Sequence, residues 1–109
     1  MDKKRYCFVC EIKEEHRDNF IEMVKTQSRE RLQAHKDAGM DELLQWIYKN
    51  IMVVYYEGDE VEKVEEKLNK LEIITKWDEI TYPMLEVAYA PAEKICDMNQ
   101  QLKGTLEPY

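Results

Sequence analysis

The stretch Leu43–Tyr56, LLQWIYKNIMVVYY, decides the fold because it holds two apolar runs separated by only two residues. Both runs are rich in aromatic and β-branched residues, which is typical of strands. The separating pair, Lys49-Asn50, has the length of a tight hairpin turn, although Asn-Gly is a stronger turn signal. We therefore predict a hairpin in which Tyr48 faces Ile51, Trp46 faces Val53 and Leu44 faces Tyr55.

A further strand is predicted before the hairpin, at Tyr6–Ile12, where successive side chains alternate between two faces. Both faces of this strand and of Ile51–Tyr56 are partly apolar, as expected of strands inside a sheet. One face should pack under helices, with Phe8, Cys10, Ile12, Ile47, Met52 and Val54. The opposite face should carry Glu11, Trp46, Tyr48, Val53 and Tyr55.

Helical periodicity occupies the segments between these strands. From Glu14 to about Ala38, apolar residues recur at spacings of three or four, which predicts one long helix that Gly39 ends. A second helix should follow Gly58, and a further helical segment, either separate from it or continuous with it, should end at Pro83. Their apolar stripes are Val61, Val64, Leu68 and Leu71, followed by Ile74, Trp77 and Ile80.

The chain closes with a predicted strand at Leu85–Tyr89 and a helix between Pro91 and Gly104. The order is then β-α-β-β-α-β with an extra C-terminal helix, which is a ferredoxin-like α+β arrangement with helices on one face of an antiparallel sheet. We expect a single domain over residues 1–109. The last helix should dock on the domain or on a partner chain.

Composition argues against several classes of partner. The 109-residue chain has 16 Lys and Arg against 23 Asp and Glu, a formal net charge of −7, so it lacks the cationic surplus that nucleic acids and anionic membranes attract. No stretch has the length and hydrophobicity of a membrane helix. The three cysteines form an odd set, and no apolar signal segment begins the sequence. These features favour a reducing, cytoplasmic setting.

The aromatic sheet face is the most informative predicted surface. A monomer that exposed such a patch would associate with itself, so we expect this face to form a homodimer interface or to enclose a small molecule. In the second case Glu11 would anchor a ligand between Trp46, Tyr48 and Tyr55.

Few other residues point to chemistry. Cys7 and Cys10 have the spacing of a redox or zinc pair, but their position on a strand and the lack of a second pair favour buried small side chains. We predict no metal site and no cofactor. His35 lies near a helix end, where a carbonyl would accept its N–H, and a structural role is favoured for it. Glu11 and His35 are nevertheless the two weak catalytic candidates.

The order of these elements resembles the dimeric α/β-barrel superfamily and, within it, the L-rhamnose mutarotase family. The resemblance implies two sheets packed face to face in a homodimer, and it implies that Trp77 lines a sugar pocket. It rests on Cys7–Ile12 (CFVCEI), Gln45–Tyr48 (QWIY), Ile51–Glu57 (IMVVYYE), Leu68–Trp77 (LNKLEIITKW) and Leu85–Pro91 (LEVAYAP).

The chain departs from the family pattern on the first helix. The family has a tyrosine there and, four residues later, a histidine that acts as acid or base, and these positions align with Phe20 and Val24. This difference favours a relative of the family over a true mutarotase. Three functions stay open: a small-molecule binding or regulatory module, a cofactor-free enzyme such as a mutarotase-like isomerase or a monooxygenase-like protein, and an interaction subunit.

Overall fold

A four-stranded antiparallel sheet forms the framework of the protein, and the computed structural model describes residues 4–104. The spatial order β2-β3-β1-β4 places β1 and β3 in the centre, as their two apolar faces indicated. The ferredoxin-like α+β prediction is thereby confirmed. The strands are β1 (Lys4–Ile12), β2 (Met40–Tyr48), β3 (Ile51–Gly58) and β4 (Leu85–Pro91).

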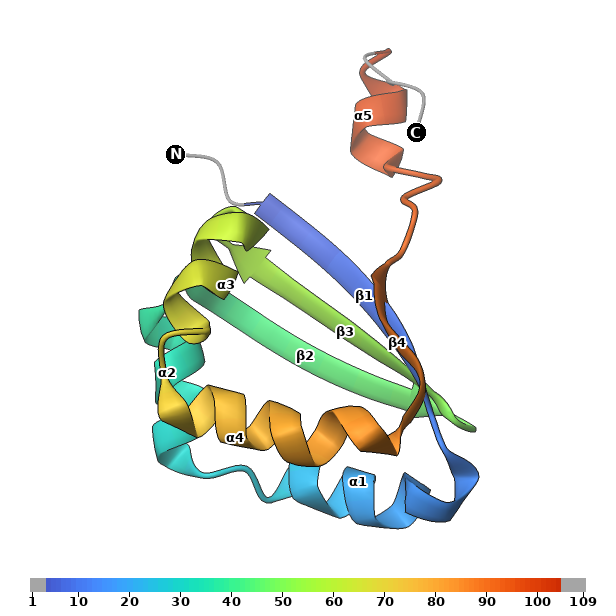
Figure 1. Cartoon of the computed structure of the whole chain (residues 1–109). Helices are drawn as coiled ribbons and strands as arrows, with labels where there is room; N and C mark the ends of the chain where they lie inside the picture. The colour runs from blue at the N-terminus through green and yellow to red at the C-terminus, as the bar shows by residue number, and fades with distance from the viewer. Residues whose placement is uncertain (1–3, 105–109) are drawn as a thin grey trace.

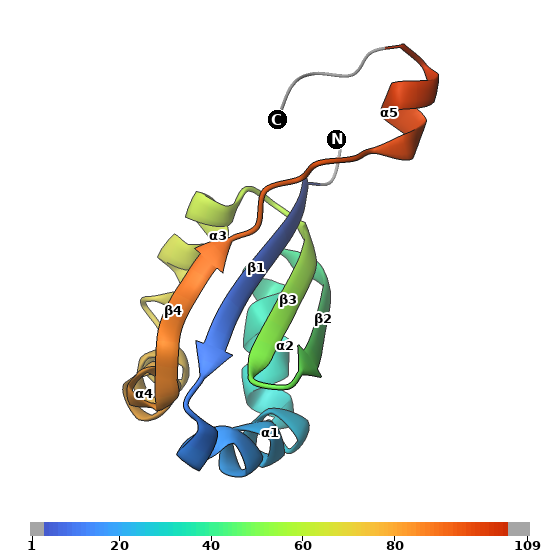
Figure 2. The same cartoon turned by 90° about the vertical axis from the view of Figure 1, so that its right-hand side faces the viewer.

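Four helices cover one face of this sheet and leave the other face open (Figures 1 and 2). Two 3₁₀ turns flank these helices along the chain. The turn η1 (Glu14–His16) precedes the first helix, and η2 (Tyr82–Met84) follows the fourth. Within residues 4–104, none of the helices has the length and hydropathy needed to cross a bilayer. The covering helices are α1 (Arg17–Lys25), α2 (Arg29–Asp37), α3 (Val61–Leu68) and α4 (Glu72–Thr81).

The hairpin has the predicted register, with Tyr48 opposite Ile51, Trp46 opposite Val53 and Leu44 opposite Tyr55. Lys49 occupies the left-handed region, at φ 54°, to make the two-residue turn. The Asn50 side chain donates a hydrogen bond to the Ile12 carbonyl at 3.0 Å, and the Ile12 amide donates to the Asn50 carbonyl at 2.8 Å. These bonds tie the turn to the end of the neighbouring strand β1.

The predicted long helix is wrong, because the segment is divided into α1 and α2. Thr26 ends α1, and its hydroxyl donates to the Glu22 carbonyl at 2.8 Å. Ser28 then takes an extended conformation and caps α2 by accepting a hydrogen bond from the Arg31 amide at 3.1 Å. A serine cap of this kind offers an amide the partner that a continuing helix would supply, so the chain can bend here at low cost.

Two separate hydrophobic clusters fill the space between sheet and helices. The first lies under α1 and consists of Cys10, Ile12, Phe20, Met52 and Met84. The second lies among α2, α3 and α4 and consists of Ala38, Val64, Leu68 and Ile74. Because the core is divided in this way, the helical layer does not close uniformly over the sheet.

Strand β4 is irregular, and this decides where its side chains point. Its pairing with β1 shifts register twice, between Val9 and Glu11 and again between Glu11 and Ile12. Leu85 therefore packs against the first hydrophobic cluster, while Val87 lies opposite Glu11 on the open face. The shift between Val9 and Glu11 returns Tyr89 to the side of the helices.

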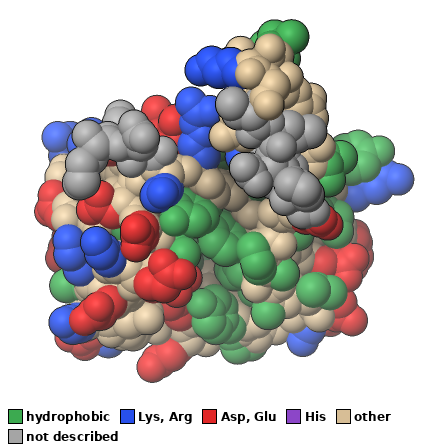
Figure 3. All heavy atoms as spheres, turned by 90° about the horizontal axis from the view of Figure 1, so that it is seen from above, with side chains coloured by type: hydrophobic (Ala, Val, Ile, Leu, Met, Phe, Trp, Pro, Cys, Tyr) green, Lys and Arg blue, Asp and Glu red, His purple; other side chains and the backbone are tan. Residues whose placement is uncertain are grey.

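The C-terminal helix is much shorter than predicted. Strand β4 continues to Pro91, and only Met98–Leu102 forms a helix, α5, which stands away from the rest of the described chain (Figures 1 and 2). Its apolar residues Met98 and Leu102 are 65% and 78% exposed rather than docked on the domain, and Ile95 in the segment before it is 81% exposed. The view from above shows the projecting segment beside a surface where hydrophobic side chains gather (Figure 3).

Candidate functional site

The residues predicted to bind a ligand are divided between the two faces of the sheet. Trp46 and Tyr48 are 56% and 72% exposed on the open face, with Tyr55 half-buried between strands there. Glu11 belongs to the same face and borders an open depression with other acidic side chains. Trp77 instead lies among the helices, so the five residues do not converge on one site in a single chain.

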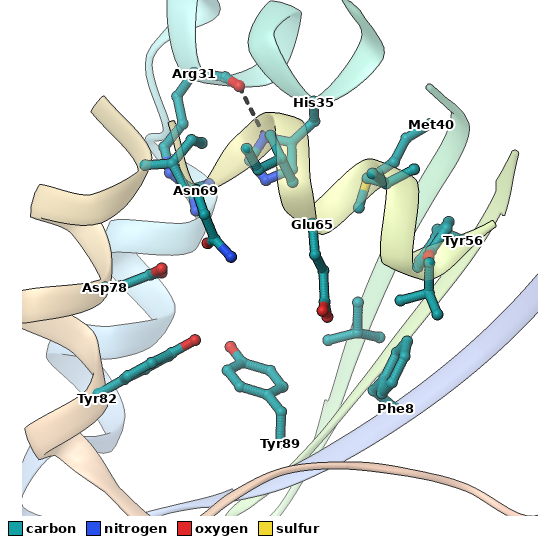
Figure 4. Close-up of a pocket in the computed structure, with 15 residues that line it drawn as sticks. Phe8, Arg31, His35, Met40, Tyr56, Glu65, Asn69, Asp78, Tyr82 and Tyr89 are labelled. Carbon is teal, nitrogen blue, oxygen red and sulfur yellow. Dashed lines mark hydrogen bonds between the residues drawn. The ribbon is translucent and has the colours of Figure 1, made fainter. Parts of the chain in front are cut away.

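A cavity of about 380 Å³ lies on the covered side, between the sheet and helices α2, α3 and α4 (Figure 4). Its volume is within the range of roughly 300–1,000 Å³ that is usual for small-molecule pockets. Six of the polar side chains that line it come from five different elements. They are Arg31 and His35 from α2, Glu65 from α3, Asp78 from α4, Tyr82 from η2 and Tyr89 from β4.

Asp78 and Tyr82 are one helical turn apart, and both side chains point into the cavity (Figure 4). They follow Ile74 at intervals of four, so they continue the face of the helix that packs inward. Burial raises the pKa of the Asp78 carboxyl above its usual value, and the nearby Arg31 charge acts in the opposite direction. A carboxylate in this position is a stronger base than an ordinary surface aspartate.

Tyr89 reaches the same part of the cavity from the sheet. Its ring centroid is 6.4 Å from that of Tyr82, and the two hydroxyl groups point toward one another (Figure 4). Burial raises the pKa of both phenols, with the charge of Asp78 adding to the effect on Tyr82 and the interaction with the neighbouring Cys10 thiol adding to the effect on Tyr89. Both hydroxyls consequently stay protonated at neutral pH and can donate hydrogen bonds.

Arg31 is a buried cation at the inner side of the cavity, with 9% of its surface exposed. Its guanidinium lies 4.0 Å from the centroid of the Trp77 ring, and one of its terminal nitrogens donates to the side-chain oxygen of Gln27. Burial lowers the pKa of Arg31, and the attraction of Asp78 opposes this change. The stack covers one side of Trp77 and holds the positive charge close to Asp78.

His35 is also buried, and its environment defines its tautomer. Nδ1 lies 2.8 Å from the Arg31 carbonyl, which can only accept, so Nδ1 carries the hydrogen and Nε2 is left as an acceptor. Burial lowers the pKa of His35, and the neutral form therefore dominates at pH 7. The predicted hydrogen bond of His35 to a carbonyl is thus present, and the ring also borders the cavity.

A smaller lobe of about 150 Å³ continues the cavity toward α1 and is lined by Phe20, Val24 and Trp77. The main and smaller lobes share Arg31 and Asp78. Phe20 and Val24 occupy the two positions where the family resemblance led us to expect a tyrosine and a histidine. Both positions therefore border this space, but both side chains are apolar. Groups able to accept or donate protons come instead from α4, η2 and β4.

The sequence did not single out Arg31, Asp78, Tyr82 or Tyr89. One signal was available for Asp78: it lies four residues after Ile74, on an otherwise inward-facing helical stripe, and a polar residue in such a stripe is unusual. The apolar stripe was instead assigned through Ile80, which is 57% exposed. Tyr89 had no comparable signal, because the two register shifts of β4 leave no mark in the sequence pattern.

The fold and the cavity define a class of small ferredoxin-like α/β proteins whose helices cover one sheet face and enclose a cavity there. The family model described as L-rhamnose mutarotase matches residues 5–103, and the chain belongs to this family. Membership corrects the interpretation of the chain as a relative outside the family. The missing tyrosine and histidine are a variation within it.

Solved structures show the same fold. The L-rhamnose mutarotase FA22100 from Formosa agariphila superposes with a TM-score of 0.69 at 18% identity, covering 87% of this chain and 98% of that one. A putative antibiotic biosynthesis monooxygenase from Nitrosomonas europaea superposes with a TM-score of 0.58 at 11% identity, covering 84% and 89%. A comparison with curated protein sequences finds no match.

Proposed function

We propose that this protein is a cofactor-free isomerase that interconverts the two anomers of a reducing sugar in the covered cavity. The observation that carries the proposal is the convergence of the Asp78 carboxylate with the hydroxyls of Tyr82 and Tyr89 (Figure 4). Family membership supports it as well, since the family model is that of a sugar mutarotase. In this proposal the residues that transfer protons come from α4, η2 and β4, and not from the first helix, where the family resemblance places a histidine.

Anomer exchange needs a proton acceptor at the anomeric hydroxyl and a proton donor at the ring oxygen. In the proposed mechanism Asp78 removes the hydroxyl proton, and the O–H electron pair forms the carbonyl as the bond between C1 and the ring oxygen breaks. The ring oxygen takes a proton from Tyr82 or Tyr89. Rotation about the C1–C2 bond and closure by the reverse steps give the other anomer, and both protons return to their donors.

Exchange-resolved NMR of L-rhamnose and a panel of neutral aldoses tests this proposal. The protein should accelerate interconversion of the anomers of at least one sugar beyond the spontaneous rate, and Asp78→Asn should reduce that acceleration about 100-fold. Asp18→Asn is the matched control, because the side chain of Asp18 is fully exposed on α1. An Asp78→Asn variant as fast as the unmodified protein would exclude the mechanism.

A second function, a binding or regulatory module, is favoured by one observation. The lobe next to α1 is walled by Phe20 and Val24, which cannot move a proton. Isothermal titration separates the two functions, because a binding module takes up a sugar at the cavity without changing the rate of anomer exchange. Binding without acceleration for every sugar would support this second function.

We also propose that the protein forms a homodimer through its open sheet face and works in the cytoplasm. Support for the dimer comes from the exposed apolar side chains on that face, which include Leu44, Trp46, Ile51 and Val87. In such a dimer Glu11, Tyr48 and Tyr55 would be enclosed between two sheets, and a ligand at these residues stays a prediction. Sedimentation equilibrium at low-micromolar concentration tests the dimer, and a monomer would exclude it.

A further inference from the structure

Glu65 is a carboxylate at the cavity that the proposed mechanism does not use. It extends from α3 over the cavity, on the side opposite α4 (Figure 4). Among residues 4–104 no cation lies within ion-pair distance of it, unlike Glu66, which pairs with Lys70 on the same helix. Glu65 is therefore a negative charge that faces the site without a partner in the described chain.

The charges around the cavity do not balance. Glu65 and Asp78 are acidic, His35 is neutral for the reason given above, and Arg31 supplies the one positive charge among the described lining residues. Arg31 is already stacked on Trp77 and bonded to Gln27, and its Nε is buried beyond the reach of a ligand. One carboxylate is thus in excess at the wall of the cavity.

The remaining walls are aromatic, and one of them carries an unsatisfied hydroxyl. Tyr56 is 3% exposed, lines the cavity, and its hydroxyl has no hydrogen-bond partner within the described part of the chain. Phe8 stacks on Tyr56 at a centroid distance of 6.2 Å, and Tyr82 and Tyr89 face them across the cavity. Aromatic faces beside an unpaired carboxylate form the usual environment for an ammonium group.

We propose that the substrate is an aldose that carries a protonated amino group, with Glu65 as its counter-ion. That the ligand is a substrate rests on the proposed isomerase function, but its binding at this site does not depend on turnover. Glu65 is exposed at the rim of the cavity, so a neutral aldose would gain no attraction from its charge, and a sugar acid would be repelled by both carboxylates. The overall charge of −7 also favours the approach of a cationic ligand.

Methyl glycosides give a test that is independent of catalysis, because a methylated anomeric oxygen cannot undergo anomer exchange. Calorimetric or NMR titration should compare methyl glucosaminide with methyl glucoside and with methyl N-acetylglucosaminide, in which the amine is uncharged. We expect the ammonium sugar to bind about five-fold more tightly than either neutral sugar. Glu65→Gln should remove this preference, and Glu66→Gln, an equally conservative change on the same helix, should retain it.

Two outcomes would overturn the inference: equal or weaker binding of methyl glucosaminide, or a preference that survives Glu65→Gln. Absence of binding by all three glycosides would overturn it as well. Anomer exchange of glucosamine and of glucose then tests the isomerase separately. A preference for the ammonium glycoside without any acceleration of anomer exchange would retain the inference and reject the isomerase. Accelerated exchange of glucose alone would retain the isomerase and reject the inference.

Discussion

The two faces of the sheet come from the same strands but have different uses. On the covered face, aliphatic side chains such as Met52 pack under the helices and leave a cavity with acidic, basic and phenolic groups. On the open face, Trp46 and Tyr48 expose most of their surface, and Trp46 borders only a small pocket of about 100 Å³ beside α1. The open face therefore offers an apolar surface for association, while the polar groups gathered on the covered face mark the candidate site.

The largest expected difference between the faces is in folding stability. Phe20→Ala removes a side chain that is 1% exposed in the first hydrophobic cluster, and it should lower the free energy of unfolding by about 3–5 kcal/mol. Trp46→Ala should cost less than about 1 kcal/mol when measured on the monomer, because more than half of that side chain is already in water. Chemical denaturation at low protein concentration measures both, and equal losses would contradict the distinction.

Dimerisation should instead depend on the open face and not on the covered face. Trp46→Lys places a charge in the proposed interface and should weaken the dimer at least about ten-fold, measured as a dissociation constant by sedimentation equilibrium. Ile80→Lys is the matched control, because Ile80 is 57% exposed against 56% for Trp46 but lies on α4. A dimer weakened by the Ile80 change and not by the Trp46 change would place the interface on the helices.

A smaller effect is expected from pH on the covered face. The pKa of His35 is lowered in the folded protein, so below about pH 6.5 the unfolded chain binds a proton that the folded chain does not. The free energy of unfolding should consequently be constant above this value and fall as the pH drops from 6.5 toward the folded-state pKa. Denaturation between pH 7.5 and 5.5, the range in which histidines titrate, should show this slope.

Two variants assign the slope. His35→Gln should abolish it, and His16→Gln, which changes the other histidine of the chain, should leave it in place. A slope that survives the change at His35 would mean that another group on the covered face titrates in this range.

The smallest effects are expected at the turn where both faces end. Lys49→Gly should stabilise the protein by up to about 1 kcal/mol, because glycine adopts the φ of 54° without the steric cost that lysine bears. Asn50→Gly should have the opposite sign, since it removes the side-chain hydrogen bond to Ile12. Midpoints of urea denaturation distinguish the two, and a loss of stability at Lys49→Gly would contradict the expected strain.

Local patterns predicted the fold where neighbouring residues decide the structure. The register of the hairpin follows from a two-residue turn and strict alternation, and it was obtained pair by pair from the sequence. The break between α1 and α2 was not predicted from the sequence, because Thr26, Gln27 and Ser28 can all occupy a helix. Only the tertiary arrangement shows that Arg31 turns inward after the break, where a continuous helix would instead have buried Leu32.

The candidate site was harder to predict because its residues come from distant parts of the chain. His35 and Trp77 were identified, one by its place near a helix end and the other by the family resemblance. Asp78 was not identified, although it lies four residues after Ile74 on the helical stripe. Glu65 was not identified either, although it lies four residues after Val61 and three before Leu68, where the helical period places it beside the apolar stripe and leaves Glu66 outside it. The difference between them is rotation about the helix axis relative to the sheet.

The two register shifts of β4 also have an evolutionary consequence. A strand has a side-chain period of two, so gain or loss of one residue exchanges the groups that face the helices with those that face away. Since β4 lies at the edge of the sheet, such an indel disturbs pairing with β1 alone. Lineages can therefore acquire or discard the phenol of Tyr89 in the cavity through one codon insertion or deletion, without substituting any catalytic residue. Divergence of activity among related proteins should be sought in strand length as well as in residue identity.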